Sequence, residues 1–109
     1  MAQTKLPPAQ KIVCVNHAGF VMNFSVSILN IEDGSTLVIG DSGSYPIGQT
    51  RVIDLADYGI EEGSLIRPFV HASWGVSNEG NRYARYSPNG ASATYHVTGT
   101  TLNYSVELV

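Results

Sequence analysis

The sequence predicts an all-β fold, an antiparallel β-sandwich of about seven to eight strands. Near the C-terminus, apolar Ala93, Tyr95 and Val97 alternate with polar residues, and the alternation resumes over residues 102–108 after Gly99. Because successive side chains of a strand point to opposite faces, this pattern is typical of a hairpin that buries one face. Turn-forming residues recur along the chain at short intervals, and no segment has a helical pattern of useful length. We therefore expect sheets packed around one core.

The N-terminal part predicts an arm followed by two strands. Two prolines near the end of the arm exclude a helix, and we expect residues 1–10 to form a flexible arm outside a single domain of residues 11–109. Residues 11–16 predict the first strand. Residues 20–28 have an apolar residue at every second position, so we expect them to form the longest and central strand.

The middle of the chain predicts shorter strands joined by turns. An Asp-Gly pair at residues 33–34 favours a hairpin turn into a strand at residues 36–39. Residues 40–48 are rich in Gly and Ser and predict an irregular crossing segment, after which residues 51–55 form a strand. We expect residues 57–63 to form a loop or a single helical turn.

The next segment predicts two more strands before the terminal hairpin. Residues 65–74 form one of them, in which Pro68 indicates an edge position or a bulge. A polar turn at residues 77–81, a short strand at residues 82–86 and a turn at residues 87–90 follow. This number of strands, with turns at this spacing, is typical of an immunoglobulin-like or related Greek-key sandwich.

Length and composition limit the classes of function. The chain has 109 residues and a mass of 11.7 kDa, which suits one domain. The formal net charge is -3, and the few Lys and Arg residues are scattered, so we expect no binding of nucleic acid or of an anionic membrane. No apolar run is long enough to cross a bilayer. The N-terminus lacks the apolar region of a signal peptide, so we expect cytoplasmic synthesis.

Nothing in the sequence predicts an enzyme. Residues 40–43 (Gly-Asp-Ser-Gly) copy the surroundings of the nucleophilic serine in some proteases, but Ser44 stands where a glycine would complete the oxyanion loop. We interpret the motif as a turn. The single cysteine, Cys14, lies in an apolar run and is expected to be a buried thiol.

The candidate metal ligands are scattered along the chain. His17, His71 and His96 lack the paired spacing of a zinc site, so we expect no zinc. Carboxylates in the predicted loops have the hard oxygen ligands that calcium prefers, and they would form a site only if the loops converged. Otherwise they are turn formers and solvated surface. These carboxylates are Asp33, Asp41, Asp54, Asp57, Glu61 and Glu62.

Aromatic and amide side chains gather at the end of the strand at residues 65–74. A sugar has an apolar face that stacks on an aromatic ring, and hydroxyls that bond to amides and Arg, so this mixture predicts a sugar site. Trp74 has a second interpretation, because the single Trp of a sandwich often anchors the core. The predicted ligand-binding residues are Trp74, Asn78, Asn81, Arg82, Tyr83, Tyr86 and Asn89.

Two blocks of sequence carry a resemblance to a known family, residues 42–55 (SGSYPIGQTRVIDL) and residues 95–106 (YHVTGTTLNYSV). They resemble the small slime-mould hemagglutinin and the C-terminal domain of the calcium-dependent cell adhesion molecule. The resemblance extends from about Lys11 onward. It implies an immunoglobulin-like sandwich that binds carbohydrate or cell surfaces and reaches the cell exterior without an ordinary signal peptide. The adhesion molecule has an additional N-terminal domain that this sequence lacks.

We therefore expect a lectin-like, hemagglutinin-type module that recognises cell-surface glycans and gains avidity as a homo-oligomer. The alternative is a cell-adhesion or structural module that acts by protein contact through its edge strands, with calcium dependence left open. Either module would act at the cell surface or outside the cell, after non-classical export.

Overall fold

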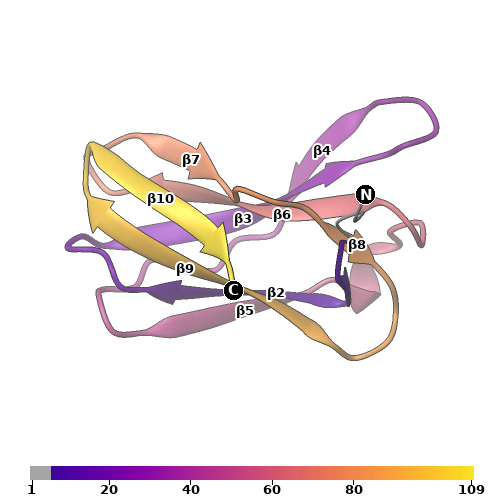
Figure 1. Ribbon diagram of the computed structural model, residues 1–109, viewed down its shortest axis with the longest axis horizontal. Helices are drawn as coiled ribbons and strands as arrows, with labels where there is room; N and C mark the ends of the chain where they lie inside the picture. Colours follow the sequence, from indigo (N-terminus) through magenta and orange to yellow (C-terminus); the bar gives the residue numbers. More distant parts are fainter. Residues whose placement is uncertain (1–5) are drawn as a thin grey trace, which may run out of the picture.

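The chain folds as a sandwich of two β-sheets, which confirms the predicted fold class (Figure 1). The computed structural model describes residues 6–109. Ten strands occur in this part, more than the seven to eight expected, because β1 and β7 are too short for a periodic pattern to indicate them. The elements are β1 (Pro8–Ala9), β2 (Lys11–Asn16), β3 (Met22–Leu29), β4 (Thr36–Ile39), β5 (Thr50–Asp54), the 3₁₀ helix η1 (Ala56–Tyr58), β6 (Leu65–Ala72), β7 (Ser77–Glu79), β8 (Ala84–Tyr86), β9 (Ser92–Thr100) and β10 (Asn103–Leu108).

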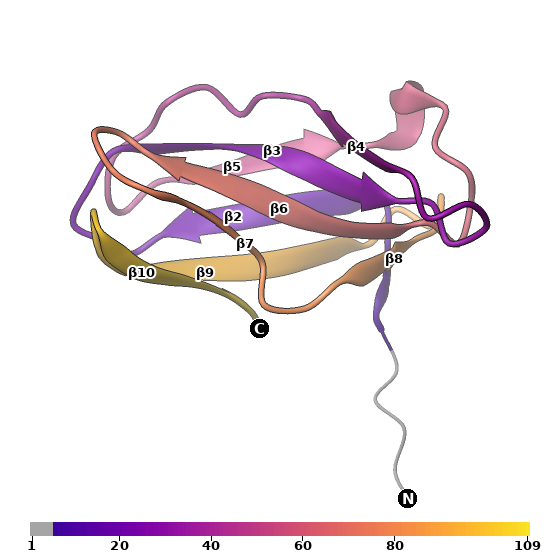
Figure 2. The same ribbon diagram turned by 90° about the horizontal axis from the view of Figure 1, so that it is seen from above.

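Each sheet contains one parallel pair of strands. The first sheet has the order β1, β8, β6, β3, β4, with β7 also pairing with β6, and the second has the order β10, β9, β2, β5. β1 runs parallel to β8 and β2 runs parallel to β9, whereas the other pairs are antiparallel. The two sheets pack face to face, as Figures 1 and 2 show from two directions. Both sheets therefore differ from the all-antiparallel arrangement that the hairpin patterns predicted.

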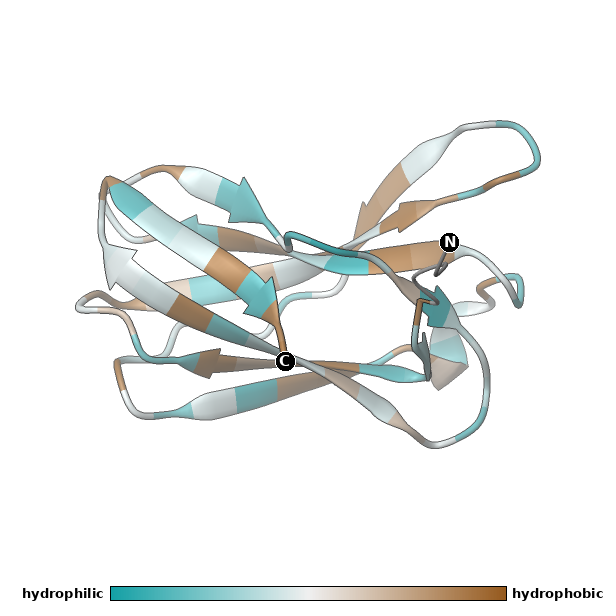
Figure 3. Ribbon diagram, viewed as in Figure 1, coloured by the Kyte–Doolittle hydropathy of each residue, from teal (hydrophilic) through white to brown (hydrophobic). Residues whose placement is uncertain are grey.

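The core lies between the sheets and is formed by alternate residues of the strands. β2 and β6 alternate between half-buried and buried positions over their whole length, which is the period that a half-buried strand requires. Tyr45, Tyr95 and Phe24 are among the largest fully buried side chains. Figure 3 shows apolar and polar residues alternating along several strands. Cys14 is buried as predicted, and burial raises the pKa of its thiol far above the ordinary value, so the thiol stays protonated.

The end of the predicted N-terminal arm, residues 1–10, is part of the fold. β1 pairs with β8, and Ala9 is fully buried. The carbonyl oxygen of Pro7 accepts a hydrogen bond of 2.9 Å from the backbone N–H of Arg85. Proline lacks a backbone donor but keeps its acceptor, so prolines are tolerated in such an edge strand. The prediction of an arm up to residue 10 is therefore wrong for its last residues, and residues 1–5 lie outside the described part of the chain.

Pro68 lies in β6, a central strand, where the sequence predicted an edge strand or a bulge. β3 pairs with β6 along the full length of one side. On the other side, β8 pairs only with the start of β6 and β7 only with residues 69–71, so Pro68 falls between two partner strands. The carbonyl oxygen of Pro68 accepts a hydrogen bond from Gly80 at 2.9 Å, which places its backbone polar groups on this interrupted side. A missing N–H is tolerated there because neither β7 nor β8 pairs with this position.

None of the helices within residues 6–109 has both the length and the hydropathy that a bilayer-spanning segment needs.

Candidate functional site

Four connections come together at one end of the sandwich, on the left in Figure 1. Backbone hydrogen bonds join three of them: the N–H of Ser73 donates to the carbonyl of Val21 at 2.9 Å, and the N–H of Val76 donates to the carbonyl of Thr101 at 3.4 Å. The fourth is held at the end of β2, where the N–H of Gly48 donates to the carbonyl of Asn16 at 2.7 Å. We call these four connections the loop end. It consists of residues 17–21 between β2 and β3, residues 46–49 before β5, residues 73–76 between β6 and β7, and residues 101–102 between β9 and β10.

Trp74 lies in the turn between β6 and β7, and its side chain is 100% exposed. Its backbone has a φ of 63°, and within residues 6–109 it is the one residue other than glycine with a positive φ. This left-handed conformation costs a bulky L-residue about 1–2 kcal/mol, and such outliers cluster at functional sites. The interpretation of Trp74 as a core anchor is therefore wrong, because the structure presents the indole ring to solvent.

The turn that presents Trp74 is held against the neighbouring hairpin. A Cβ atom on Gly75 would collide with the backbone carbonyl of Thr101, so glycine allows the two turns to approach each other closely. The N–H of Gly75 also donates to the carbonyl of Ala72 at 3.1 Å, which closes the turn. The backbone of the turn that carries Trp74 is thus held by the turn between β9 and β10 as well as by its own hairpin.

The loop end carries apolar side chains and none of the charged residue types. Residues 16–21, 45–49, 72–77 and 98–104 contain no Asp, Glu, Lys or Arg. Several exposed apolar side chains belong to this end, and gathered apolar side chains of this kind mark an interaction surface. Besides Trp74 they are Leu102, Ile47, Val76 and Val21.

Leu102 was expected among the buried residues of the terminal hairpin, but it is 72% exposed. The reason is that β10 begins one residue later, at Asn103, and the buried positions of that strand are Tyr104 and Val106. Leu102 therefore belongs to the turn beside Trp74, and sequence reasoning missed it as a site residue. The one signal was its place directly after Gly99, Thr100 and Thr101, which are turn-compatible residues.

The side-chain amides of Asn78 and Asn81 form hydrogen bonds to other parts of the fold. The Nδ2 atom of Asn78 donates to the carbonyl of Tyr104 at 2.8 Å, and the Oδ1 atom of Asn81 accepts a hydrogen bond from the N–H of Leu108 at 2.9 Å. Both bonds join the segment around β7 to β10 in the other sheet. These two hydrogen bonds are a structural reason for the polar side chains after β6, and this reason does not involve a ligand.

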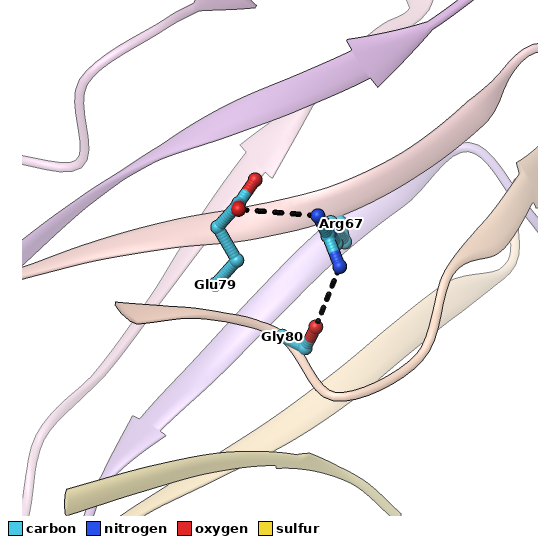
Figure 4. Close-up of polar contacts among 3 residues, drawn as sticks. All are labelled: Arg67, Glu79 and Gly80. Carbon is cyan, nitrogen blue, oxygen red and sulfur yellow. Dashed lines mark hydrogen bonds and ion pairs between the residues drawn. The ribbon is translucent and has the colours of Figure 1, made fainter. Parts of the chain in front are cut away.

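Arg82 and Tyr83 lie beside a second polar cluster. Arg67 forms an ion pair with Glu79 at 3.1 Å and donates to the carbonyl of Gly80 at 3.4 Å (Figure 4). The Arg67 guanidinium lies over the ring of Tyr83, 4.3 Å from the ring centroid. The Tyr83 ring therefore packs against a cation of the sheet, and the Arg82 side chain is exposed.

Tyr86 and Asn89 lie at the opposite end of the sandwich from Trp74. β8, which contains Tyr86, pairs with the first residues of β6, whereas Trp74 follows the last residue of that strand (Figure 1). Tyr86 is buried in the core, and the Oδ1 atom of Asn89 accepts a hydrogen bond from Ala91 within its own turn. The predicted set of seven residues is therefore not one site, and Trp74 is separated from these two members by the length of β6.

The structure also brings together two histidines that the sequence placed apart. The rings of His17 and His96 meet edge to face with centroids 4.7 Å apart, because β2 and β9 are neighbours in the second sheet. Within residues 6–109 no three His, Cys, Asp or Glu side chains come together to hold a metal ion.

Residues 40–43 belong to an irregular segment between β4 and β5, as the Gly- and Ser-rich composition of residues 40–48 predicted, and not to a backbone hydrogen-bonded turn. The hydroxyl of Ser42 donates to the carbonyl of Gly43 and accepts from the N–H of Phe24, each at 2.8 Å. The Oδ1 atom of Asp41 accepts from the N–H of Gly43 at 2.9 Å. The motif therefore has a local structural role in covering β3.

Comparisons with known proteins extend the description of the fold. No family model matches the chain, and no curated protein matches it. Among solved structures, the chain is similar to a Gram-negative toxin, with 15% identity and a TM-score of 0.50. It is also similar to listeriolysin O, with 18% identity and a TM-score of 0.50. Both matches cover 91% of this chain and 22% of the other, so this chain corresponds to under a quarter of each toxin and shares its fold there.

Proposed function

We propose that this chain is a carbohydrate-binding module that attaches to cell-surface glycans through the loop end. The observation that carries the proposal is the complete exposure of the Trp74 ring on a turn that is fixed by its neighbour. An indole ring in water gains free energy when it stacks on the apolar face of a pyranose. The backbone turn that carries the ring is already held in place, so stacking on this ring also avoids the entropic cost of ordering a loop.

The surroundings of Trp74 suit a neutral, hydroxyl-rich ligand. Ser73, Thr101 and Asn103 bring hydroxyl and amide groups to the same end of the sandwich, and such groups both donate and accept hydrogen bonds. No formal charge competes with them in the four loops. A single shallow site of this kind binds weakly, so agglutination of cells requires two or more copies in one particle.

Replacement of Trp74 tests the proposal on a glycan array. We expect Trp74→Ala to weaken binding about tenfold, because a stacked aromatic ring contributes about 0.5–1.5 kcal/mol beyond its buried area. Trp74→Phe should retain part of the binding, since a smaller ring still stacks. Tyr58→Ala is the matched control, because Tyr58 is an exposed aromatic residue at the other end. Undiminished binding by a folded Trp74→Ala variant, or no glycan bound by the wild type, would contradict the proposal.

A second candidate function is attachment to the lipid surface of a membrane. The specific observation is that Leu102, Val76 and Val21 are exposed beside Trp74 in loops that lack charged residues. Trp is enriched at membrane interfaces, and apolar side chains enter the boundary between headgroups and acyl chains. Glycan-free phosphatidylcholine vesicles separate the two functions. Lipid attachment predicts co-sedimentation that Leu102→Ser abolishes, whereas glycan recognition predicts no co-sedimentation.

Adhesion by protein contact is supported by the edges of the sheets. β4 ends the first sheet and exposes Leu37 and Val38, and β5 ends the second and exposes Val52. Exposed apolar edge strands are templates for pairing with another chain. A stable dimer in sedimentation equilibrium, together with an array on which no glycan binds, would favour this function over the first.

A further inference from the structure

A surface pocket of about 310 Å³ lies at the end of the sandwich opposite the loop end. It is bounded on one side by β4 and the turn between β3 and β4, and on the other by the segment from η1 to the start of β6. Ile28, Ile39 and Ile60 give it apolar walls, and the half-exposed ring of Tyr58 forms part of the rim. Its volume falls in the range of small-molecule sites in proteins.

One polar side chain in the pocket is almost completely buried. Ser64 is 6% exposed and lines the pocket. Its backbone is held on both sides, since its N–H donates to the carbonyl of Glu61 at 3.1 Å and its carbonyl accepts from the N–H of Tyr86 at 2.8 Å. Its hydroxyl has no hydrogen-bond partner among residues 6–109, but its oxygen is not fully enclosed, because the enclosed and unpaired side-chain atom in this part of the chain is the Nε of Arg67. The hydroxyl oxygen is therefore accessible from the pocket, where a ligand can replace water as its hydrogen-bond partner.

The segments that form the pocket are acidic. Residues 30–35 and 56–64 contain five carboxylates and no Lys or Arg. Arg85 contacts one of these segments, since its Nη1 atom donates to the carbonyl of Gly63 at 3.3 Å. Of these five acidic residues, Glu61 lines the pocket. A pocket edged by one sign of charge raises the local concentration of ligands of the opposite sign.

We propose that this pocket binds a small organic cation that carries a short apolar group, such as a substituted primary amine. The apolar group packs between the isoleucines, and the ammonium group lies next to the carboxylate of Glu61 and the ring of Tyr58. The hydroxyl of Ser64 accepts one N–H of the ammonium group. This site is separate from the loop end, so it does not depend on glycan recognition.

Titration of the full chain with three probes that share a phenyl ring, followed by amide chemical shifts, tests the charge requirement. We expect benzylamine, which is a cation at neutral pH, to bind at least about tenfold more tightly than neutral benzyl alcohol, because only the cation pairs with the carboxylate. Benzoate should bind more weakly still. The shifts should map to residues 28–39 and 58–64 and weaken at high salt. Equal binding of the three probes, or shifts confined to other residues, would overturn the proposal.

Two glutamate variants test the assigned contact. Glu61→Gln should weaken benzylamine binding about fivefold to tenfold, whereas Glu62→Gln should change it less than twofold, because Glu62 does not line the pocket. Trp74→Ala should leave benzylamine binding unchanged, which keeps the test independent of the glycan proposal. Equal effects of the two glutamate variants would show that the acidic segments as a whole attract benzylamine, and would refute a specific contact with Glu61 in the pocket.

Discussion

At the scale of single residues, Trp74 occupies a position that neither burial nor backbone preference favours. Its ring is in contact with water, and its φ of 63° lies in the region that glycine and asparagine adopt more readily. Selection for stability alone would favour glycine or asparagine at this position. The sequence alone did not reveal this, because a Trp after an apolar strand is also typical of a core residue.

Substitution of Trp74 by residues of different backbone preference should change stability in opposite directions. Trp74→Asn should raise the free energy of unfolding by about 0.5–1 kcal/mol, because Asn tolerates the left-handed region. Trp74→Val should lower it by about 1 kcal/mol, because a β-branched residue is strained there. Urea denaturation measures both. A shift of the same sign for the two variants would mean that the backbone conformation is not the cause.

Gly75 should be the loop-end glycine that is most sensitive to substitution. Gly75→Ala places a methyl group against the carbonyl of Thr101 and should lower the free energy of unfolding by about 1–3 kcal/mol. Gly19→Ala is the matched control, since an added Cβ there meets no atom within 4 Å and φ is not positive. We expect the control to change stability by less than about 0.5 kcal/mol. Thermal unfolding that ranks the control as the more damaging variant would exclude this explanation.

At the scale of elements, hairpins and turns were predictable and long-range pairings were not. The Asp-Gly turn between β3 and β4 and the terminal hairpin are present as predicted, because their signals are local in sequence. The pairing of β1 with β8 has no local signal, since neither short strand has enough residues to show alternation. The sequence also did not show that the predicted ligand residues are spread over the fold, where Asn78 and Asn81 bond to β10 rather than to each other or to Trp74.

Gln10, which lies between β1 and β2, donates a hydrogen bond to the carboxylate of Asp54 in β5, and this contact depends on pH. Hydrogen bonds from the N–H of Ala56 and then from the side chain of Gln10, each 3.0 Å long, lower the pKa of Asp54 below its ordinary value. Since the folded-state pKa is the lower one, this stabilisation is complete above the unfolded-state pKa of about 4 and is lost as pH falls through the folded-state pKa. Gln10→Ala should raise the pKa of Asp54 in a carboxyl NMR titration.

Gln49→Ala is the control for that titration, because Gln49 lies at the loop end, far from Asp54. It should leave the pKa of Asp54 unchanged. If the two variants gave the same titration curve, the side chain of Gln10 would not be a cause of the lowered pKa.

At the scale of the whole molecule, the two ends of the sandwich differ in chemistry. The loop end exposes apolar side chains and lacks Asp, Glu, Lys and Arg, whereas the segments at residues 30–35 and 56–64 at the other end are acidic. Each end is assembled from loops that are distant in sequence, since β2 near the N-terminus lies between β5 and β9 (Figure 1). One rigid scaffold therefore presents two different surfaces.

The same topology should make folding slow. Both sheets need pairings between residues that are far apart in the chain, such as Lys11 with Ser92 in β2 and β9. Chains dominated by such non-local pairings fold in milliseconds to seconds. Stopped-flow circular dichroism after dilution from denaturant measures this rate. A refolding phase in microseconds would contradict the assigned order of strands.

The sequence by itself determined the fold class, most strand positions and the burial of Cys14, because a period of two reports directly that one face of a strand is buried. Only the tertiary structure decided that Trp74 faces water, that Leu102 lies beside it in the loop end, that the N-terminal residues from Pro7 onward join the first sheet and that His17 meets His96. The physical reason is that alternation describes the local environment of one strand. Which turns meet at an end depends on how strands from distant parts of the chain pair, and no local pattern encodes that pairing.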